Sequence, residues 1–429
     1  MEAIYDTTLA GQARTAKRPQ KATSVAADAV LVGWLVLISM QPADIVFAAT
    51  ALLALIGLVT RAPTAPRLFA FLWPFLLLTV AGALVGAASR TFEAWPFVRD
   101  LVYFTKAPLI LLVAFGLAQW VGEFERILRA IFFASLFLAA SYLAEYVIVG
   151  GWEFDRRSLQ LTVGRAYYLM FFGLLVAILR PSAIAASVPS QATLACLGSV
   201  VMIAAAVAST SRGILLCPAF FLICLALHKM RVPFRPVLIA SVAIVTFLSI
   251  PPFYATISGL IHVLDSPGIN EVFTSDFGSE AQIHSAFRSY EAHLAWQQYL
   301  NLTTWQQLFG KGFGSLVELT MAVDLGVTAE SKTTLTAVPI THISLLTALL
   351  KFGVFGAAIY TLSLLFLAVR RDECADGLAV LFNRTAVMLA LFVVWAFQGY
   401  FSTLDIMNVA LAIIGATQAM AAKRHHGAV

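Results

Sequence analysis

Long apolar segments, separated by short polar ones, make up most of the chain. A helix needs about 20 apolar residues to cross a bilayer, and about 17 are tolerated. The pattern therefore predicts an all-α polytopic membrane protein with about twelve transmembrane helices. The predicted helices cover residues 24–41, 44–60, 68–88, 101–119, 127–149, 165–180, 190–209, 213–228, 236–252, 344–369, 380–400 and 405–421. Residues 1–23 and 422–429 remain as polar terminal tails.

A long polar segment, residues 253–343, separates the predicted helices of residues 24–252 from those of residues 344–421. A loop of this length usually has structure of its own and a function. Ser279 and Gln282 have the spacing of a helix capping box. Apolar residues then recur at helical spacing, at Ile283, Phe287, Tyr290 and Leu294. The loop is therefore expected to be partly helical, with an amphipathic helix of about 22 residues.

Composition supports a membrane environment and excludes several classes of protein. The 429 residues are 60% hydrophobic and only 12% charged, whereas soluble domains are about one quarter charged. The net charge of +5 is spread between apolar segments, so no nucleic-acid surface is expected. The four cysteines lack a C-x-x-C spacing, which indicates neither a disulfide framework nor a metal site.

The distribution of Lys and Arg predicts how the chain is oriented. Cytoplasmic loops of membrane proteins are enriched in these residues. Placing the N-terminus in the cytoplasm puts more than half of the 28 basic residues on that side. An even number of helices then returns the C-terminus to the cytoplasm and places the loop 253–343 outside. No small-residue cleavage site follows the basic N-terminal segment, so the first helix is expected to be uncleaved.

Basic residues that remain on the outer side are mostly arginines. They are Arg90, Arg99, Arg156, Arg157, Arg165, Arg212, Arg288, Lys311 and Lys332. A guanidinium group binds phosphate oxygens with two parallel hydrogen bonds, so a pyrophosphate at the outer interface is one interpretation. The other is contact with lipid headgroups or surface ion pairs. Lys106 lies two helical turns after Arg99 inside an apolar segment, where it either lines a cavity or reaches back to the interface.

Three further segments contain residue types suited to chemistry. Residues 210–213 (TSRG) provide hydroxyl groups and Arg212 at a predicted helix boundary, although small residues there also allow tight helix packing. Residues 309–315 (FGKGFGS) form either an anion-binding nest of backbone N–H groups or a flexible turn. His342, where the loop re-enters the membrane, can accept a proton near neutral pH or be purely structural. Gly353 and Gly356 after it predict a bend into the tenth helix.

In this order, these segments resemble the bacterial O-antigen polymerase and ligase superfamily. The similarity covers residues 100–400 and depends on residues 210–213, Arg288 with Trp296 and the run 309–315, and His342 followed by residues 351–356. The resemblance implies a GT-C-like glycosyltransferase of the bacterial inner membrane that needs neither metal nor cofactor. Its substrates would be undecaprenyl-pyrophosphate-linked glycans at the periplasmic face, with both termini of the chain cytoplasmic.

The resemblance also implies roles for particular residues. Arg212 and Arg288 would bind and neutralise the pyrophosphate, and His342 would act as the base or orient the acceptor hydroxyl. A second set would guide the lipid headgroup and glycan; it consists of Arg99, Lys106, Arg156, Arg157, Arg165 and Lys311. The chain departs from the family at Ile343, where relatives often have Asn after the histidine, and this leaves the orientation of His342 open.

Several activities remain open at this point. A polymerase would extend a growing lipid-linked chain, whereas a ligase would transfer the finished glycan to lipid A-core. Leu308 and the glycines after it are more similar to exopolysaccharide polymerases, which favours the first. A transporter or flippase would show inverted repeats and ionisable residues at helix midpoints, and a receptor or scaffold would not explain the outer arginines. Expected partners are the lipid-linked donor, the acceptor glycan, membrane lipids, and flippase and chain-length regulator proteins, but no nucleic acid.

Overall fold

The computed structural model describes the greater part of the chain. The described residues are 21–40, 43–60, 65–88, 93–154, 158–159, 162–163, 167–184, 191–209, 212–248, 250, 287–324, 334–338, 341, 343–369, 376–392 and 405–427. Within them the chain is predominantly α-helical, as the apolar pattern predicts. Each of the twelve predicted segments contains a helix.

The long helices follow the predicted segments closely. They are α1 (Lys21–Met40), α2 (Ala43–Thr60), α3 (Ala65–Ala87), α4 (Ala94–Val121), α5 (Phe124–Ile148), α7 (Leu169–Leu179), α9 (Gln191–Ala208), α10 (Arg212–Lys229), α11 (Phe234–Leu248), α17 (Ser344–Val369), α18 (Gly377–Phe392) and α19 (Asp405–Gly427). Shorter elements are η2 (Gly151–Glu153), α8 (Pro181–Ile184), α15 (Phe287–Leu300), α16 (Thr304–Phe309), and the strands β1 (Val317–Asp324) and β2 (Thr334–Val338).

Among the described residues, three stretches of helix are long and apolar enough to cross a membrane. They are α4, α5 and the Ser344–Leu362 part of α17. This finding suggests that the protein associates with a membrane. Helix α4 begins seven residues before the apolar segment predicted at 101–119, so Arg99 and Asp100 lie inside the helix rather than in a loop.

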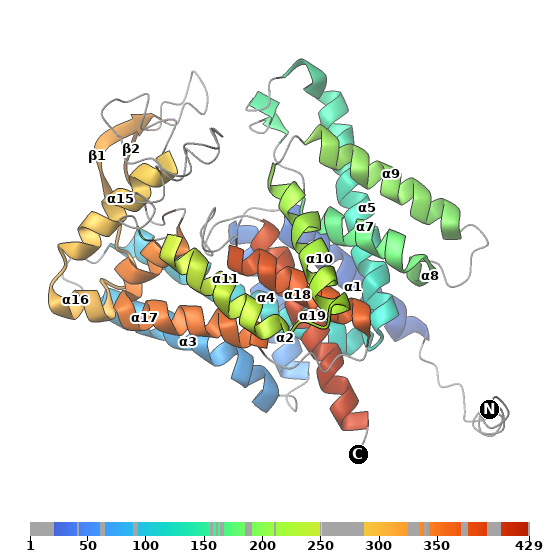
Figure 1. Cartoon of the computed structure of the whole chain (residues 1–429), viewed down its shortest axis with the longest axis horizontal. Helices are drawn as coiled ribbons and strands as arrows, with labels where there is room; N and C mark the ends of the chain where they lie inside the picture. The colour runs from blue at the N-terminus through green and yellow to red at the C-terminus, as the bar shows by residue number, and fades with distance from the viewer. Residues whose placement is uncertain are drawn as a thin grey trace.

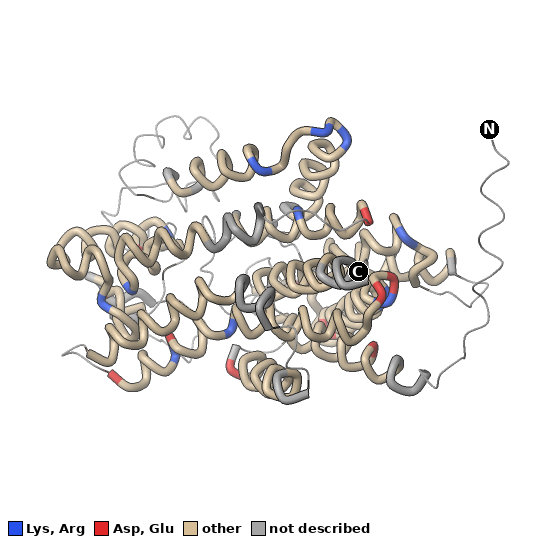
Figure 2. The backbone as a smooth tube through the Cα atoms, turned by 90° about the horizontal axis from the view of Figure 1, so that it is seen from below, with Lys and Arg blue, Asp and Glu red and all other residues tan. Residues whose placement is uncertain are grey.

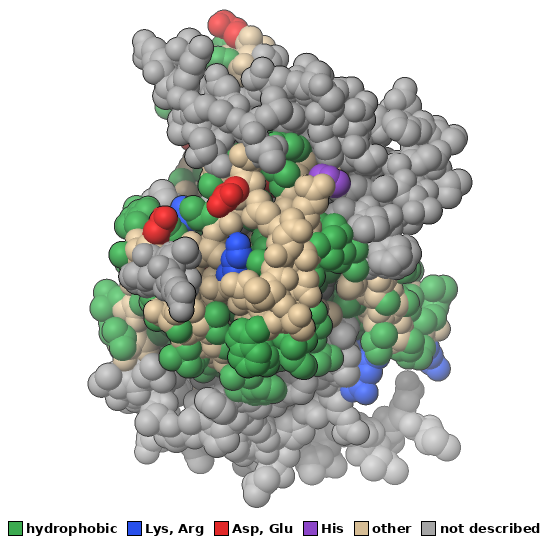
Figure 3. Space-filling model, turned by 90° about the vertical axis from the view of Figure 1, so that its left-hand side faces the viewer, with side chains coloured by type: hydrophobic (Ala, Val, Ile, Leu, Met, Phe, Trp, Pro, Cys, Tyr) green, Lys and Arg blue, Asp and Glu red, His purple; other side chains and the backbone are tan. Residues whose placement is uncertain are grey.

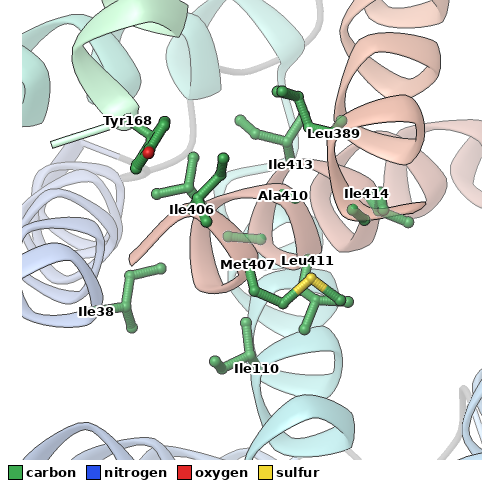
Figure 4. Packing of buried hydrophobic residues seen from close by; sticks show 14 of the residues in the cluster. Ile38, Ile110, Tyr168, Leu389, Ile406, Met407, Ala410, Leu411, Ile413 and Ile414 are labelled. Atoms are coloured by element: carbon green, nitrogen blue, oxygen red, sulfur yellow. The ribbon is translucent and has the colours of Figure 1, made fainter. Parts of the chain in front are cut away.

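The core is centred on the last helix, α19, which packs most extensively on α4 and also contacts α18 and α1. Figure 4 shows apolar side chains of α19 between Ile110 of α4, Ile38 of α1 and Leu389 of α18. At Gly415 a Cβ atom would lie 2.8 Å from Cβ of Ala114. Small residues at such contacts let helices approach closely, as in membrane-helix packing.

Contacts near the ends of the described helices include two groups. In one group Arg126 at the start of α5 pairs with Asp28 of α1 at 2.8 Å. Nearby, Arg180 after α7 pairs with Glu125 at 3.1 Å and with Asp376 before α18 at 2.8 Å. The other group joins the end of α3 to the start of α4 and the first half of α17 (Figure 1). Figure 2 shows that charged residues lie mostly toward helix ends.

The segment predicted as a loop folds at the left-hand side of Figure 1 into α15, α16 and the β1–β2 hairpin. Helix α15 buries Tyr290 and Leu294 but also Ser289 and Glu291, so a helix is confirmed over the described part of this prediction, whereas its amphipathic character is not. The predicted cap at Ser279 lies outside the described residues. The antiparallel hairpin was not predicted; its register pairs Val317 with Val338 and is shifted between Glu318 and Val323.

Candidate functional site

The segment 309–315, called the glycine run below, is threaded between α3 and α17. Helix α16 begins with a complete capping box formed by Thr303 and Gln306, and it ends at Phe309, the first residue of the run. The N–H groups of Lys311 and Gly312 then donate to the carbonyl oxygens of Leu350 and Lys351, at 2.8 and 2.9 Å. These acceptors are free because α17 breaks at Gly353, which has φ +66° and ψ −168°. The run therefore replaces hydrogen bonds that an unbroken helix would make internally.

Two more backbone donors of the glycine run also bind protein acceptors. The N–H of Phe313 donates to the carbonyl oxygen of Gly82 in α3 at 2.9 Å. The N–H of Gly314 donates to Oδ2 of Asp100 in α4 at 2.7 Å. With four successive N–H groups occupied, the run is not an anion-binding nest, and that interpretation was wrong. It is not a loose turn either, because acceptors from three helices hold it.

Glycine is required in this segment because backbones meet there. A Cβ atom at Gly310 would lie 2.3 Å from the carbonyl carbon of Lys351, and one at Gly312 would lie 2.1 Å from the backbone nitrogen of Gly86. On the other side of the contact, a Cβ atom at Gly353 would lie 2.3 Å from the carbonyl carbon of Leu308. Gly310, Gly312 and Gly353 also have positive φ angles, which residues with a side chain adopt at a cost. The predicted bend at Gly353 is confirmed.

Aromatic side chains pack together where the glycine run meets α4 and α17. Phe313 is 3% exposed. Its ring centroid lies 5.0 Å from that of Phe104 in α4 and 5.8 Å from that of Phe352 in α17. Aromatic pairs at these separations add to the burial of apolar surface. The run, α4 and α17 therefore form one packed unit.

A buried ion pair lies inside this unit. Nζ of Lys351 in α17 donates to Oδ2 of Asp100 in α4 at 2.5 Å and to the carbonyl oxygen of Ser315 at 2.9 Å. The side chains of Lys351 and Asp100 are 2% and 0% exposed. Ionisable residues in apolar helices face the bundle interior and pair with one another. The pair fixes α17 to α4 beside the glycine run.

Arg99 directly precedes Asp100, yet no described residue accepts a hydrogen bond from its Nε or Nη2 atom, and both atoms are buried. The side chain as a whole is partly exposed. Its charge interacts with those of Asp100 and Lys351. A buried guanidinium nitrogen without an acceptor is costly. This end of α4 therefore has hydrogen-bond donors ready for an anion.

Lys106 lies seven residues further along α4, about 10 Å away along the helix axis. It is 3% exposed, and its Nζ lies 6.0 Å from the centroid of the Tyr103 ring, a contact of the cation–π type. Arg99 and Lys106 thus place two positive charges on one helix, the first on a partly exposed side chain and the second on an enclosed one.

Arg288 and Lys311 belong to the elements outside the long helices. Arg288 is in the first turn of α15, partly buried, and α15 packs against α17 and β1. Lys311 is partly exposed within the glycine run. On α15, burial lowers the pKa of His293, whose Nε2 lies 2.8 Å from Nε2 of Gln297. Figure 3, which views this end, shows basic and acidic side chains near its centre among hydrophobic ones.

The remaining predicted site residues are described only in part. Arg212 is the first residue of α10, and only its backbone is described. His342 lies outside the described residues, as do others in the predicted set, namely Arg90, Arg156, Arg157, Arg165 and Lys332. The residues beside His342 are fixed: the N–H of Thr341 donates to Oγ1 of Thr347 at 3.0 Å, and Ile343 is 2% exposed.

An exposed aromatic row extends from α16 to α17. The ring centroids of Trp305 and Phe309 are 4.2 Å apart, and those of Phe309 and Phe355 are 5.4 Å apart. Trp305 is 68% exposed. Of these rings, Trp305 is of a type that is enriched at membrane–water interfaces. The row includes Phe309, the first residue of the glycine run, and α16 and the first half of α17, which carry its rings, lie at the left-hand side of Figure 1.

Sequence reasoning did not identify Asp100 and gave Lys351 no role. A signal was present, because an acidic and a basic residue in separate apolar segments are expected to pair. Within the described part of the chain, no three His, Cys, Asp or Glu side chains are grouped closely enough to hold a metal ion. Neither a scan against models of protein families nor a search of curated proteins finds a match to this chain.

Proposed function

We propose that this chain is a bacterial inner-membrane glycosyltransferase that polymerises undecaprenyl-pyrophosphate-linked repeat units at the periplasmic face. The observation that carries the proposal is the Arg99 guanidinium, whose buried Nε and Nη2 have no acceptor among the described residues. A pyrophosphate supplies several anionic oxygens that accept such hydrogen bonds. A preformed set of positive donors is suited to a leaving group that gains negative charge.

The proposed topology has twelve membrane-spanning helices and both termini in the cytoplasm. Helices α15 and α16, the hairpin and the glycine run then lie on the periplasmic side, together with the start of α4. The ion pairs of Arg126 and Arg180 lie at the cytoplasmic end. The enrichment of Lys and Arg in the loops on that side supports this orientation.

In the proposed reaction, the acceptor hydroxyl oxygen attacks the anomeric carbon of the donor sugar. The bond from that carbon to the pyrophosphate oxygen breaks, and the lipid pyrophosphate leaves with the bonding electrons. His342 accepts the hydroxyl proton or orients the hydroxyl group. Arg212, Arg288 and Arg99 neutralise the leaving group, and Lys106, Lys311, Arg156, Arg157 and Arg165 line its approach.

The experiment is a glycan gel from a deletion strain complemented with variants of this chain. Arg99→Gln, Arg288→Ala and His342→Ala should each abolish polymer while single repeat units still reach their carrier. Arg231→Gln is the matched control, because Arg231 is exposed in the turn between α10 and α11. It should behave as the wild type.

Two other outcomes would change the conclusion. Lipid-linked polymer that accumulates without transfer to lipid A-core would identify a ligase instead. Normal polymer in all three site variants, with protein levels equal to those of the wild type, would overturn the site assignment.

A further inference from the structure

Arg99 and Asp100 are neighbours of opposite charge that do not pair with each other. Consecutive side chains of a helix point in different directions, although these two are close enough to interact electrostatically. Instead Oδ2 of Asp100 accepts from Nζ of Lys351 and from the N–H of Gly314. Asp100 therefore already has two donors, and Arg99 has no acceptor among the described residues.

The positive charge of Arg99 is not compensated within this cluster. Lys351 and Asp100 compensate each other, and both are enclosed. Arg99 is close enough to interact electrostatically with both. Oδ1 of Asp100 is buried and has no hydrogen-bond partner among the described residues. An Asp100 carboxylate that lost Lys351 would therefore keep Arg99 as the other positive charge that interacts with it.

We propose that Lys351 is a positioning residue. By forming an ion pair with Asp100, it keeps the Arg99 guanidinium available to a pyrophosphate or another phosphate anion. This inference rests on the proposed function, which requires Arg99 to bind an anion, and adds the reason why Arg99 is free to do so. Lys351 acts through Asp100 and is not itself a catalytic residue.

The two members of the pair then have unequal effects on anion binding. Lys351→Met leaves Asp100 without its cation, so Asp100 turns to Arg99 and competes with the ligand. Asp100→Asn removes the competitor, and Arg99 stays free. In the double variant Asp100→Asn/Lys351→Met neither charge remains, and Arg99 is free again. A purely structural ion pair would instead make both single variants equally harmful.

The test measures binding of farnesyl pyrophosphate to the full-length protein in phosphatidylcholine nanodiscs. Arg99→Gln and Lys351→Met should each weaken binding by about tenfold or more, as expected for loss of a charge-assisted hydrogen bond. Asp100→Asn and the double variant should bind within about threefold of the wild type. Lys351→Arg, which keeps the cation, is the conservative control and should bind as the wild type does. Thermal unfolding of every variant separates lost binding from lost folding.

The outcomes distinguish failure of the proposed function from failure of this inference. Wild-type protein that binds no pyrophosphate would defeat both. Binding that Arg99→Gln abolishes but Lys351→Met leaves intact would overturn the role of Lys351 alone. That role would also be overturned if Asp100→Asn and Lys351→Met lose binding equally, or if the double variant remains as weak as Lys351→Met. Competition by added phosphatidylglycerol that disappears in Arg99→Gln would show that a lipid headgroup phosphate occupies the same guanidinium.

Discussion

Lys351 in α17 and Asp100 in α4 are 251 positions apart in sequence, and they form a buried ion pair in the structure. Neither side chain reaches solvent, so each charge depends on the other for compensation. The Gly314 N–H and the Ser315 carbonyl oxygen complete the arrangement. The pair therefore joins two helices and the segment between them.

Breaking this pair from one side should destabilise the protein more than removing it altogether. Asp100→Asn or Lys351→Met leaves one buried group without its countercharge, at a cost of about 3–5 kcal/mol. The double variant should recover most of that loss. Thermal unfolding in detergent, followed by tryptophan fluorescence, measures the effect. Additive losses in the double variant would contradict the prediction.

Gly353→Ala should destabilise the break in α17. Its φ of +66° strains a residue with a side chain by about 1–3 kcal/mol. The new Cβ would also overlap the backbone of Leu308. Gly33→Ala is the control, because Gly33 lies in α1 and a Cβ there meets nothing within 4 Å. The control should keep or slightly raise the unfolding temperature; an equal loss in both variants would refute the argument from close packing.

Removing the ring of Phe313 should lower the free energy of unfolding far more than removing the larger ring of Trp305. Phe313→Ala empties a site that is 3% exposed between α4 and α17, and such truncations cost about 3–5 kcal/mol. Trp305 is 68% exposed, so Trp305→Ala should change the free energy of unfolding by only about 0.5 kcal/mol. Chemical denaturation of the two variants side by side would show the difference. Similar values would mean that the glycine run is not packed as described.

Stability should decrease as the pH falls through the range where His293 titrates. Burial lowers its pKa below the ordinary value of 6.5, so the folded state favours the neutral imidazole. From about pH 6.5 downward the unfolded chain binds a proton that the folded chain does not, and stability is lost until the folded pKa is reached. Unfolding temperatures from pH 8 to pH 5 would test this. The unfolding temperature of His293→Gln should fall less steeply with decreasing pH than that of the wild type. An unchanged pH dependence would mean that other groups cause the loss of stability.

The apolar pattern predicted where the helices lie, because a segment that is apolar for about 17 or more residues favours a helix in a membrane. It misplaced the start of α4, since Arg99 and Asp100 interrupt the apolar pattern while the helix continues through them. The hairpin was missed although the first five residues of β1 (Val317–Asp324) alternate apolar and polar, which is a strand signal.

The candidate site was harder to predict because its partners are distant in sequence. The glycine run left a choice between an anion nest and a flexible turn. Its acceptors come from Gly82 and Asp100 on one side and from Leu350 and Lys351 on the other. Local sequence contains no information on such pairings. A bend at Gly353 was predicted from the sequence, but not that it frees the carbonyl oxygens of Leu350 and Lys351 as acceptors.

The long sequence separation within the ion pair has a consequence for biogenesis. In the proposed topology, a chain inserted as it is made places α4 in the membrane well before Lys351 is synthesised. At about 5–20 residues per second, the intervening 251 residues take roughly 13 to 50 seconds. During that time Asp100 must stay protonated, remain at the lipid surface or be sheltered by the insertion machinery. Docking of α17 and the glycine run on α4 is thus a late step in the assembly of this part of the protein.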